Sequence, residues 1–113
     1  MNALPRLVLA HLVLGLPLSF ATVPASADPA RLALGKRVFT ELSEPRCGIC
    51  HTLADAGTTG EIGPALDTLK PDAGRVATAV TNGIGVMPAF EDLTPEQVAA
   101  VADYVATVTG AAK

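Results

Sequence analysis

Apolar residues recur at helical spacing in three stretches after residue 28, and none alternates as in an amphipathic strand. The first stretch is Pro29 to Leu42, which ends before Pro45. Its predicted buried face consists of Leu32, Gly35, Val38, Phe39 and Leu42. A glycine inside a helix costs about 1 kcal/mol relative to alanine. Gly35 therefore predicts a close contact with another backbone or ring.

Capping signals predict two further helices. Lys70-Pro71-Asp72 opens the second helix, with Asp72 as its N-cap, and Asn82-Gly83 closes it. Its predicted buried stripe is Val76, Ala79 and Val80. Thr94-Pro95-Glu96-Gln97 opens the third helix with a capping box, and Gly110 closes it. The apolar stripe of this last helix is Val98, Val101, Ala102, Val105 and Val108.

Tyr104 lies beside the stripe of the last helix and is expected to pack on Gly35 and Phe39 as a core residue. The segment from Thr52 to Asp67 is rich in glycine, threonine and aspartate, which predicts mostly loop. Together these patterns predict one all-α domain of three or four short helices.

The first 27 residues have the pattern of a secretory signal peptide. Arg6 precedes an apolar run from Leu7 to Phe20, and Ala25-Ser26-Ala27 follows as a small-residue cleavage site. We expect cleavage after Ala27, export, and a mature single domain of residues 28–113 with no membrane span. The run is shorter than the roughly 20 residues of a comfortable transmembrane helix, but an uncleaved anchor remains an alternative.

Composition limits which partners the protein can bind and what can fill its core. The chain has eleven acidic and eight basic residues, a net charge of −3, and cleavage would also remove Arg6. An acidic protein is a poor match for nucleic acid or an anionic membrane surface. The predicted domain has no tryptophan, and its aromatic residues are Phe39, Phe90 and Tyr104. A large, flat, apolar cofactor would fill a core that small side chains leave open.

The two cysteines stand in the order Cys47-Gly48-Ile49-Cys50-His51. A structural disulfide here would close only a tiny loop, and a thioredoxin-like redox site would need a βαβ context that the sequence lacks. A zinc site would need a fourth ligand and usually a second pair of ligands. The Cys-x-x-Cys-His spacing is instead typical of c-type haem attachment.

Haem chemistry requires this spacing. The thiols of Cys47 and Cys50 add across the two vinyl groups on one edge of the porphyrin, and His51 then reaches the iron as the proximal ligand. Covalent attachment also retains the haem in an exported protein. The predicted cofactor is therefore one haem c.

The second axial position of the iron decides what such a haem can do. After cleavage, Met87 is the remaining methionine and His51 the remaining histidine. Met87 is followed by Pro88 in a glycine-rich segment, which suits a stiff loop approaching a flat ligand. Met87 is our candidate ligand, although a core role for it stays open. Lys36, Lys70, Tyr104 or an open iron remain the other possibilities.

A metal-bound histidine usually donates its second ring N–H to a carbonyl or carboxylate. The segment Gly63-Pro64-Ala65-Leu66 stands out in the predicted loop. The backbone carbonyl of Pro64 is the candidate acceptor for His51, and a simple turn is the alternative. Ligation by His51 and Met87 would fill both axial positions, which favours an electron carrier over a haem catalyst.

With these residues the chain resembles the class I c-type cytochromes over residues 28–113. The matching positions are Gly35, Phe39 and Tyr104 of the terminal helices, then Cys47, Cys50 and His51, then Gly63, Pro64 and Leu66, and finally Met87-Pro88. The resemblance implies a small cytochrome c fold, in which helices wrap around one covalent haem, and a periplasmic location in bacteria.

Residues 50–57, 66–72 and 82–88 are similar to the small cytochrome subunit of periplasmic sulfite dehydrogenases. This resemblance implies a molybdenum-containing subunit that oxidises sulfite and passes electrons to the haem, a downstream cytochrome or oxidase, and no catalytic site in this chain itself. The alternatives are a general periplasmic carrier that serves a terminal oxidase or reductase, a haem peroxidase or ligand sensor with a displaceable Met87, and a thiol redox module. The sequence departs from lysine-ringed respiratory cytochromes, since its lysines are Lys36, Lys70 and Lys113.

Overall fold

The computed structural model describes Gly15 and residues 28–112, and the signal peptide predicted for residues 1–27 therefore lies almost entirely outside the described residues. The described domain is mostly helical, as the apolar pattern predicted. Three longer helices are α1 (Pro29–Arg37), α4 (Ala73–Asn82) and α5 (Pro95–Val108). Two single turns, α2 (Cys47–Cys50) and α3 (Leu66–Leu69), lie between them. In the described part, no helix has the length and apolarity needed to cross a membrane.

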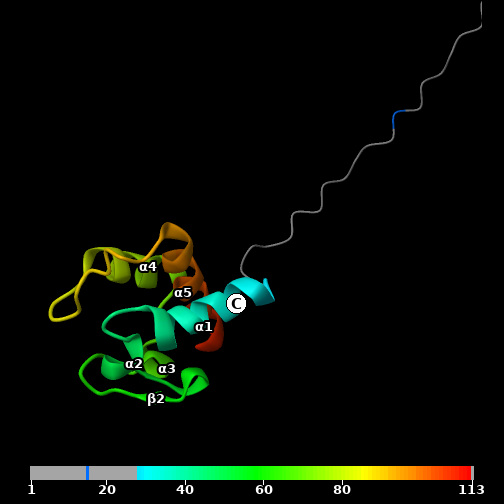
Figure 1. The fold of residues 1–113 in the computed structure, drawn as a ribbon. Coiled ribbons are helices and arrows are strands. Elements are labelled where there is room, and N and C mark those ends of the chain that lie inside the picture. Colours follow the sequence, from blue (N-terminus) through cyan, green and yellow to red (C-terminus); the bar gives the residue numbers. More distant parts are fainter. Residues whose placement is uncertain (1–14, 16–27, 113) are drawn as a thin grey trace, which may run out of the picture.

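Helices α1 and α5 cross at the centre of the domain, with α4 on one side and α2, α3 and β2 on the other (Figure 1). Gly35 is at the crossing. A Cβ placed there would stand 2.2 Å from the carbonyl oxygen of Ala100 and 2.5 Å from Cβ of Tyr104. The predicted close contact at Gly35 is confirmed, because only a residue without a side chain lets the two backbones approach this closely.

The first helix does not stay α-helical to Leu42. Residues Val38–Leu42 form a π-helical turn, η2, closed by the bond from the Ser43 N–H to the carbonyl of Val38 at 3.2 Å. A π turn contains one residue more than an α turn. The residues in it therefore no longer lie on the face that regular α-helical spacing predicts. Val38 and Phe39 are buried as predicted, whereas Leu42 is 39% exposed, and its assignment to the buried face was wrong.

The segment predicted as loop contains a small hairpin. Strands β1 (Thr52–Leu53) and β2 (Thr58–Thr59) pair antiparallel around the 3-10 turn η3 (Ala54–Ala56). The Thr58 hydroxyl accepts from the Leu53 N–H and donates to the His51 carbonyl. Two-residue strands are too short to show an alternating pattern, so side-chain bonds rather than periodicity define this element. Helix α3 also begins at Leu66, inside the predicted loop.

The capping signals of the last two long helices are confirmed. The Asp72 side chain accepts from the Arg75 N–H, and Thr94 and Gln97 form the reciprocal bonds of a capping box. Gly83 ends α4 with φ of +71°. Tyr104 is a core residue, 2% exposed, whose ring meets that of Phe39 edge to face at a centroid distance of 6.2 Å.

Candidate functional site

A cavity of about 930 Å³ lies between the two sides of the domain. Its lining residues come from α4 and the loop that follows it and, on the other side of the domain in Figure 1, from α2 and the segment leading to α3. Phe39, Val101 and Val105 close its floor from the core. Its volume is near the upper end for small-molecule and cofactor sites. An apolar space of this size in so small a core is suited to a large, flat ligand.

The single turn α2 brings three predicted site residues to the cavity wall. Cys47 and Cys50 are half-buried, and both line the cavity together with His51. The bond from the His51 N–H to the Cys47 carbonyl, 3.0 Å long, closes the turn. Side chains three residues apart lie on one face of a helical turn. The two sulfurs would therefore face the same edge of a bound ligand, and the imidazole would approach it from the same segment.

The glycines around α2 are required by close packing. A Cβ at Gly48 would stand 2.3 Å from Cγ2 of Thr58, and one at Gly60 would stand 2.5 Å from the carbonyl oxygen of Ile49. The hairpin thus packs directly on the backbone of the Cys-x-x-Cys turn. This support fixes the orientation of the turn relative to the cavity.

Nδ1 of His51 lies 2.8 Å from the backbone carbonyl oxygen of Pro64. A carbonyl oxygen only accepts, so Nδ1 carries the hydrogen and donates it. Nε2 is then the ring nitrogen with a free lone pair, which is the form that binds a metal. The Gly63 N–H donates in turn to the Cys50 carbonyl at 2.8 Å. The loop is thereby tied both to the imidazole and to the turn that carries it.

Met87 lines the cavity on the side opposite α2, from the loop that follows α4. Ile84 and Met87 exchange two backbone hydrogen bonds of 3.0 Å each, with Gly85 at φ of +57° in the turn between them. The Phe90 N–H then donates to the Val80 carbonyl at 2.9 Å and ties the end of the loop to α4. Met87 is half-buried and packs against the hydrophobic core. A ligand between α2 and this loop would have His51 on one face and Met87 on the other.

The other candidate ligands of the sequence do not line the cavity. Lys36 donates to both the backbone carbonyl and Oδ2 of Asp55, and the Tyr104 hydroxyl donates to Oδ2 of the same carboxylate. Lys70 also lies outside the cavity wall. The Tyr104–Asp55 bond was not predicted, because nothing in the sequence indicates that residues in the hairpin turn and α5 meet.

Ser43 is a further residue that sequence reasoning missed. It is 2% exposed, and its Oγ lies 3.3 Å from Sγ of Cys47. Burial raises the pKa of the Cys47 thiol, and the bond with Ser43 offsets part of this rise. The contact depends on the π turn that precedes it, and the sequence gives no signal for a π turn.

The donor set fits a covalent haem better than the alternative uses of the cysteines. Cys47 and Cys50 are both free thiols in the structure. Among residues 28–112, no three His, Cys, Asp or Glu side chains gather as ligands for one metal ion. The site instead offers two thiols, one imidazole and one thioether around an apolar cavity. These groups match two thioether links and two axial ligands of a haem.

Comparisons with known proteins agree with this chemistry. The family model described as "Cytochrome C oxidase, cbb3-type, subunit III" matches residues 30–105. Among solved structures, the chain is similar to the c-type cytochrome SorU from Sinorhizobium meliloti, with 64% sequence identity and a TM-score of 0.72. That match covers 74% of this chain and 95% of the SorU chain. A search of curated proteins found no match.

Proposed function

Because the chain belongs to the c-type cytochromes, which carry a covalent haem c and transfer electrons, we propose that His51 and Met87 are its axial iron ligands. We further propose that Cys47 and Cys50 form the two thioether links and that the Pro64 carbonyl orients His51. The bound haem supplies a single-electron change at its iron. The residues of this chain hold that iron in one coordination state during the change.

The observation that carries this assignment is the placement of His51 and Met87 on two walls of one apolar cavity. Occupation of both axial positions leaves no site on the iron for a substrate. The hydrogen bond from His51 to Pro64 and the paired bonds of the 84–87 turn hold both ligands in place. A site whose ligands need not move between redox states suits a carrier of electrons.

We place the protein in the periplasm on the basis of its N-terminal pattern. Arg6, the apolar run that follows it and Ala25-Ser26-Ala27 together form a signal for export. The covalent attachment implied by Cys47 and Cys50 supports this location, because it retains the cofactor outside the cytoplasm.

The protein partner that we propose as electron donor is a molybdenum-containing sulfite-oxidising subunit. The proposal rests on the similarity of residues 50–57, 66–72 and 82–88 to the cytochrome subunit of sulfite dehydrogenases. The surface near the cavity supports a protein partner, since Ile62, Ile84 and Val86 line the cavity and are largely exposed, Val86 by 88%.

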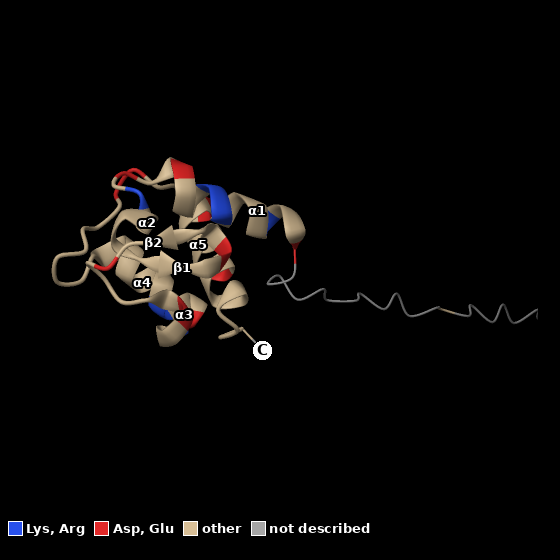
Figure 2. Cartoon of the chain, turned by 90° about the horizontal axis from the view of Figure 1, so that it is seen from below, with Lys and Arg blue, Asp and Glu red and all other residues tan. Residues whose placement is uncertain are grey.

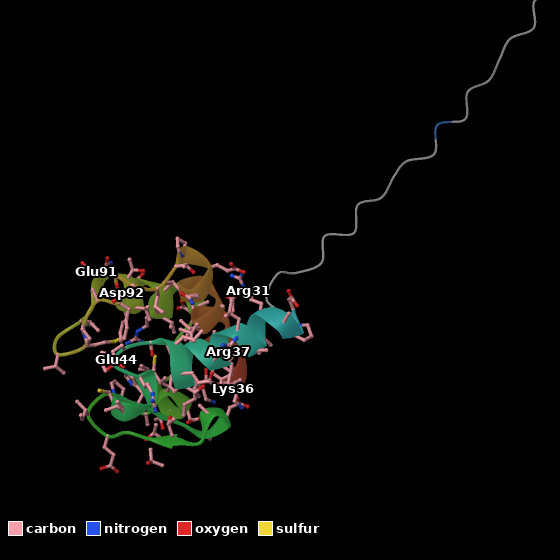
Figure 3. All side chains as sticks on the ribbon, viewed as in Figure 1. Arg31, Lys36, Arg37, Glu44, Glu91 and Asp92 are labelled. Atoms are coloured by element: carbon pink, nitrogen blue, oxygen red, sulfur yellow. The ribbon has the colours of Figure 1, made fainter. Side chains whose placement is uncertain are left out.

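The charge distribution also separates this chain from lysine-ringed carriers. Figure 3 shows Arg31 and Arg37 along α1, whereas Glu91 and Asp92 lie on the side of the view that holds the protruding 83–90 loop. A partner that approaches this loop would therefore meet exposed apolar side chains beside charges of both signs, because the exposed Arg46 and Arg75 line the same cavity. That surface suits a partner with an apolar contact surrounded by charged residues of both signs.

The test is to purify the native holoprotein from its source and measure reduction of its haem by sulfite. We expect a molybdenum-containing protein to co-purify with it or to restore rapid sulfite-dependent reduction when added back. Reduction by several unrelated donors, with none dependent on sulfite, would instead support a general carrier. A purified chain without haem, with a reducible Cys47–Cys50 bridge, would contradict the haem assignment itself.

A further inference from the structure

The two sulfurs of the Cys-x-x-Cys turn differ in their surroundings. Oγ of Ser43 lies 3.3 Å from Sγ of Cys47, within hydrogen-bonding distance for sulfur. In the part of the chain that the structure describes, no side-chain hydrogen bond of this kind reaches Sγ of Cys50. A polar partner therefore holds the sulfur of Cys47 in a way that the sulfur of Cys50 does not share.

Ser43 contacts the sulfur from outside the cavity. Its side chain is 2% exposed, and it is not among the residues that line the cavity, although Cys47 is. The Ser43 backbone N–H donates to the Val38 carbonyl at 3.2 Å and closes the π turn η2. Any effect of the hydroxyl on a ligand in the cavity therefore passes through the Cys47 sulfur.

The burial of the Ser43 hydroxyl itself calls for an explanation. A buried hydroxyl is costly unless it forms a hydrogen bond. The buried hydroxyl of Thr109 meets this need within its own helix segment, by donating to the Val105 carbonyl at 2.8 Å. The hydroxyl of Ser43 meets it with the sulfur of Cys47. An apolar side chain would fill this position without needing any partner, so the hydroxyl points to a role at the sulfur.

The main freedom left to the Cys47 side chain is rotation about χ1. The bond from the His51 N–H to the Cys47 carbonyl and the packing of Gly48 against Thr58 fix the backbone of the turn. Helix α2 carries no charged residue and is tan in Figure 2, so no ion pair within it orients a sulfur. Three staggered χ1 positions are open to such a side chain. The contact with Ser43 favours the position seen in the structure.

We propose that Ser43 is a positioning residue for haem attachment, whose hydroxyl holds the Cys47 sulfur in the orientation from which it adds to a haem vinyl group. This inference rests on the proposed function, in which Cys47 and Cys50 form the two thioether links. In the addition, the S–H bond and the π bond of the vinyl group break, and one C–S bond and one C–H bond form. No electrons are gained or lost, and haem is the one co-reactant.

The same hydrogen bond is compatible with the thiol and with the linked product. A thiol sulfur both donates and accepts weakly, whereas a thioether sulfur only accepts. After attachment the Ser43 hydroxyl therefore donates to the Cys47 sulfur. The contact does not have to break as the link forms.

The experiment compares the exported wild type with Ser43→Ala, which removes a single oxygen atom from the buried site. Chains are sampled at short intervals after synthesis and treated with an alkylating reagent that labels unlinked thiols. Mass spectrometry of the haem-bearing peptide then reports each cysteine separately. Labelling is needed because an addition reaction leaves the mass of chain plus haem the same for one link as for two.

Without the hydroxyl, the Cys47 sulfur would populate all three χ1 positions. We therefore expect link formation at Cys47 to slow about threefold in Ser43→Ala, with no change at Cys50. Chains linked through Cys50 alone keep one vinyl group conjugated with the porphyrin, so their visible absorption should lie at longer wavelength. The matched control is Thr40→Ala, which removes a hydroxyl that lies in the same π turn and bonds to the Lys36 carbonyl. It should attach haem like the wild type.

The ratio between the two cysteines separates positioning from a structural role. Equal slowing at both cysteines, including a Ser43→Ala chain that carries no haem at all, would indicate a structural role and overturn the proposal. Wild-type rates at both cysteines in Ser43→Ala, or an equal effect in Thr40→Ala, would overturn it as well. A wild-type chain that attaches no haem would contradict the proposed function instead, so the two failures are distinguishable.

Discussion

The imidazole of His51 rests against the backbone at Gly63, where a Cβ would stand 2.5 Å from Cε1 and 2.9 Å from Nδ1 of the ring. The same loop accepts the ring's hydrogen bond at the Pro64 carbonyl. One loop therefore sets both the plane and the tautomer of the imidazole. Gly63 is needed because a side chain there would collide with the ring. Pro64 contributes the carbonyl oxygen that accepts the hydrogen bond.

The variant Gly63→Ala should displace the His51 ring. We expect a loss of about 1–3 kcal/mol in the free energy of unfolding, typical of overpacking, together with a partly high-spin spectrum. Visible spectroscopy and urea unfolding of the holoprotein measure both effects. The control is Gly57→Ala, since a Cβ at Gly57 meets no atom within 4 Å although its φ is +67°. That variant should lose some stability but keep the wild-type spectrum, and an unchanged spectrum in Gly63→Ala would contradict the prediction.

Removal of the thioether should open the iron. In Met87→Ala we expect the methionine–iron charge-transfer band of the oxidised protein to vanish and the reduced protein to bind CO rapidly. The neighbouring variant Val86→Ala is the control, because Val86 is almost fully exposed and should leave the band intact. Persistence of the band in Met87→Ala, or rapid CO binding by the wild type, would show that another residue or an open iron takes this position.

The bond from the Tyr104 hydroxyl to Asp55 should stabilise the fold in a pH-dependent way. The bond to Tyr104 is the largest cause that lowers the pKa of Asp55, and bonding and charge from Lys36 add to it. Since the folded pKa lies below the unfolded value, near 4, the added stability is present above that value. It is lost as pH falls through the folded pKa.

Tyr104→Phe keeps the ring against Phe39 and removes only the hydroxyl. We expect it to cost about 1 kcal/mol at pH 7, as for a typical hydrogen bond, and less as the pH falls below 4. Urea unfolding of wild type and variant across this range measures the difference. A cost that stays constant with pH would indicate that Asp55 is not the group involved.

The crossing of α1 and α5 leaves no room for a side chain at position 35. A glycine-to-alanine change inside a helix normally stabilises a protein by about 0.4–1 kcal/mol. Gly35→Ala should instead destabilise it by about 2 kcal/mol or more, because the new Cβ meets the Ala100 carbonyl and Tyr104. Thermal unfolding of the holoprotein tests this.

The matched control for that prediction is Gly74→Ala in α4. A Cβ at Gly74 would meet only Oδ1 of Asp72, at 3.2 Å, which also caps α4 and would have to shift by a few tenths of an ångström. We expect this variant to change stability by much less than Gly35→Ala does. Equal effects at positions 35 and 74 would mean that close helix packing is not what Gly35 provides.

Much of the fold was predictable because its signals are local. The caps at Asp72 and Thr94 act within three residues of each helix start, and the apolar stripes repeat within single helices. The π turn and the hairpin were missed for the opposite reason. The π turn depends on the Ser43 N–H reaching Val38, and the hairpin depends on bonds from the Thr58 side chain.

The sequence by itself determined the chemistry available to this protein. The Cys47-Gly48-Ile49-Cys50-His51 motif predicts a covalent haem with its own imidazole, and Met87 stands out as the candidate second ligand after the predicted cleavage. Covalent and coordination chemistry depend on the identity and spacing of neighbouring residues, which a sequence states directly.

Only the tertiary structure decided which distant groups share one site. It brings Met87 to the wall opposite His51, lays Pro64 against the imidazole, and places Arg46 and Arg75 at the same cavity. It also occupies Lys36 and Tyr104 with Asp55, outside that cavity. These relationships arise from the packing of helices over long sequence separations. The sequence pattern of any one segment does not contain them.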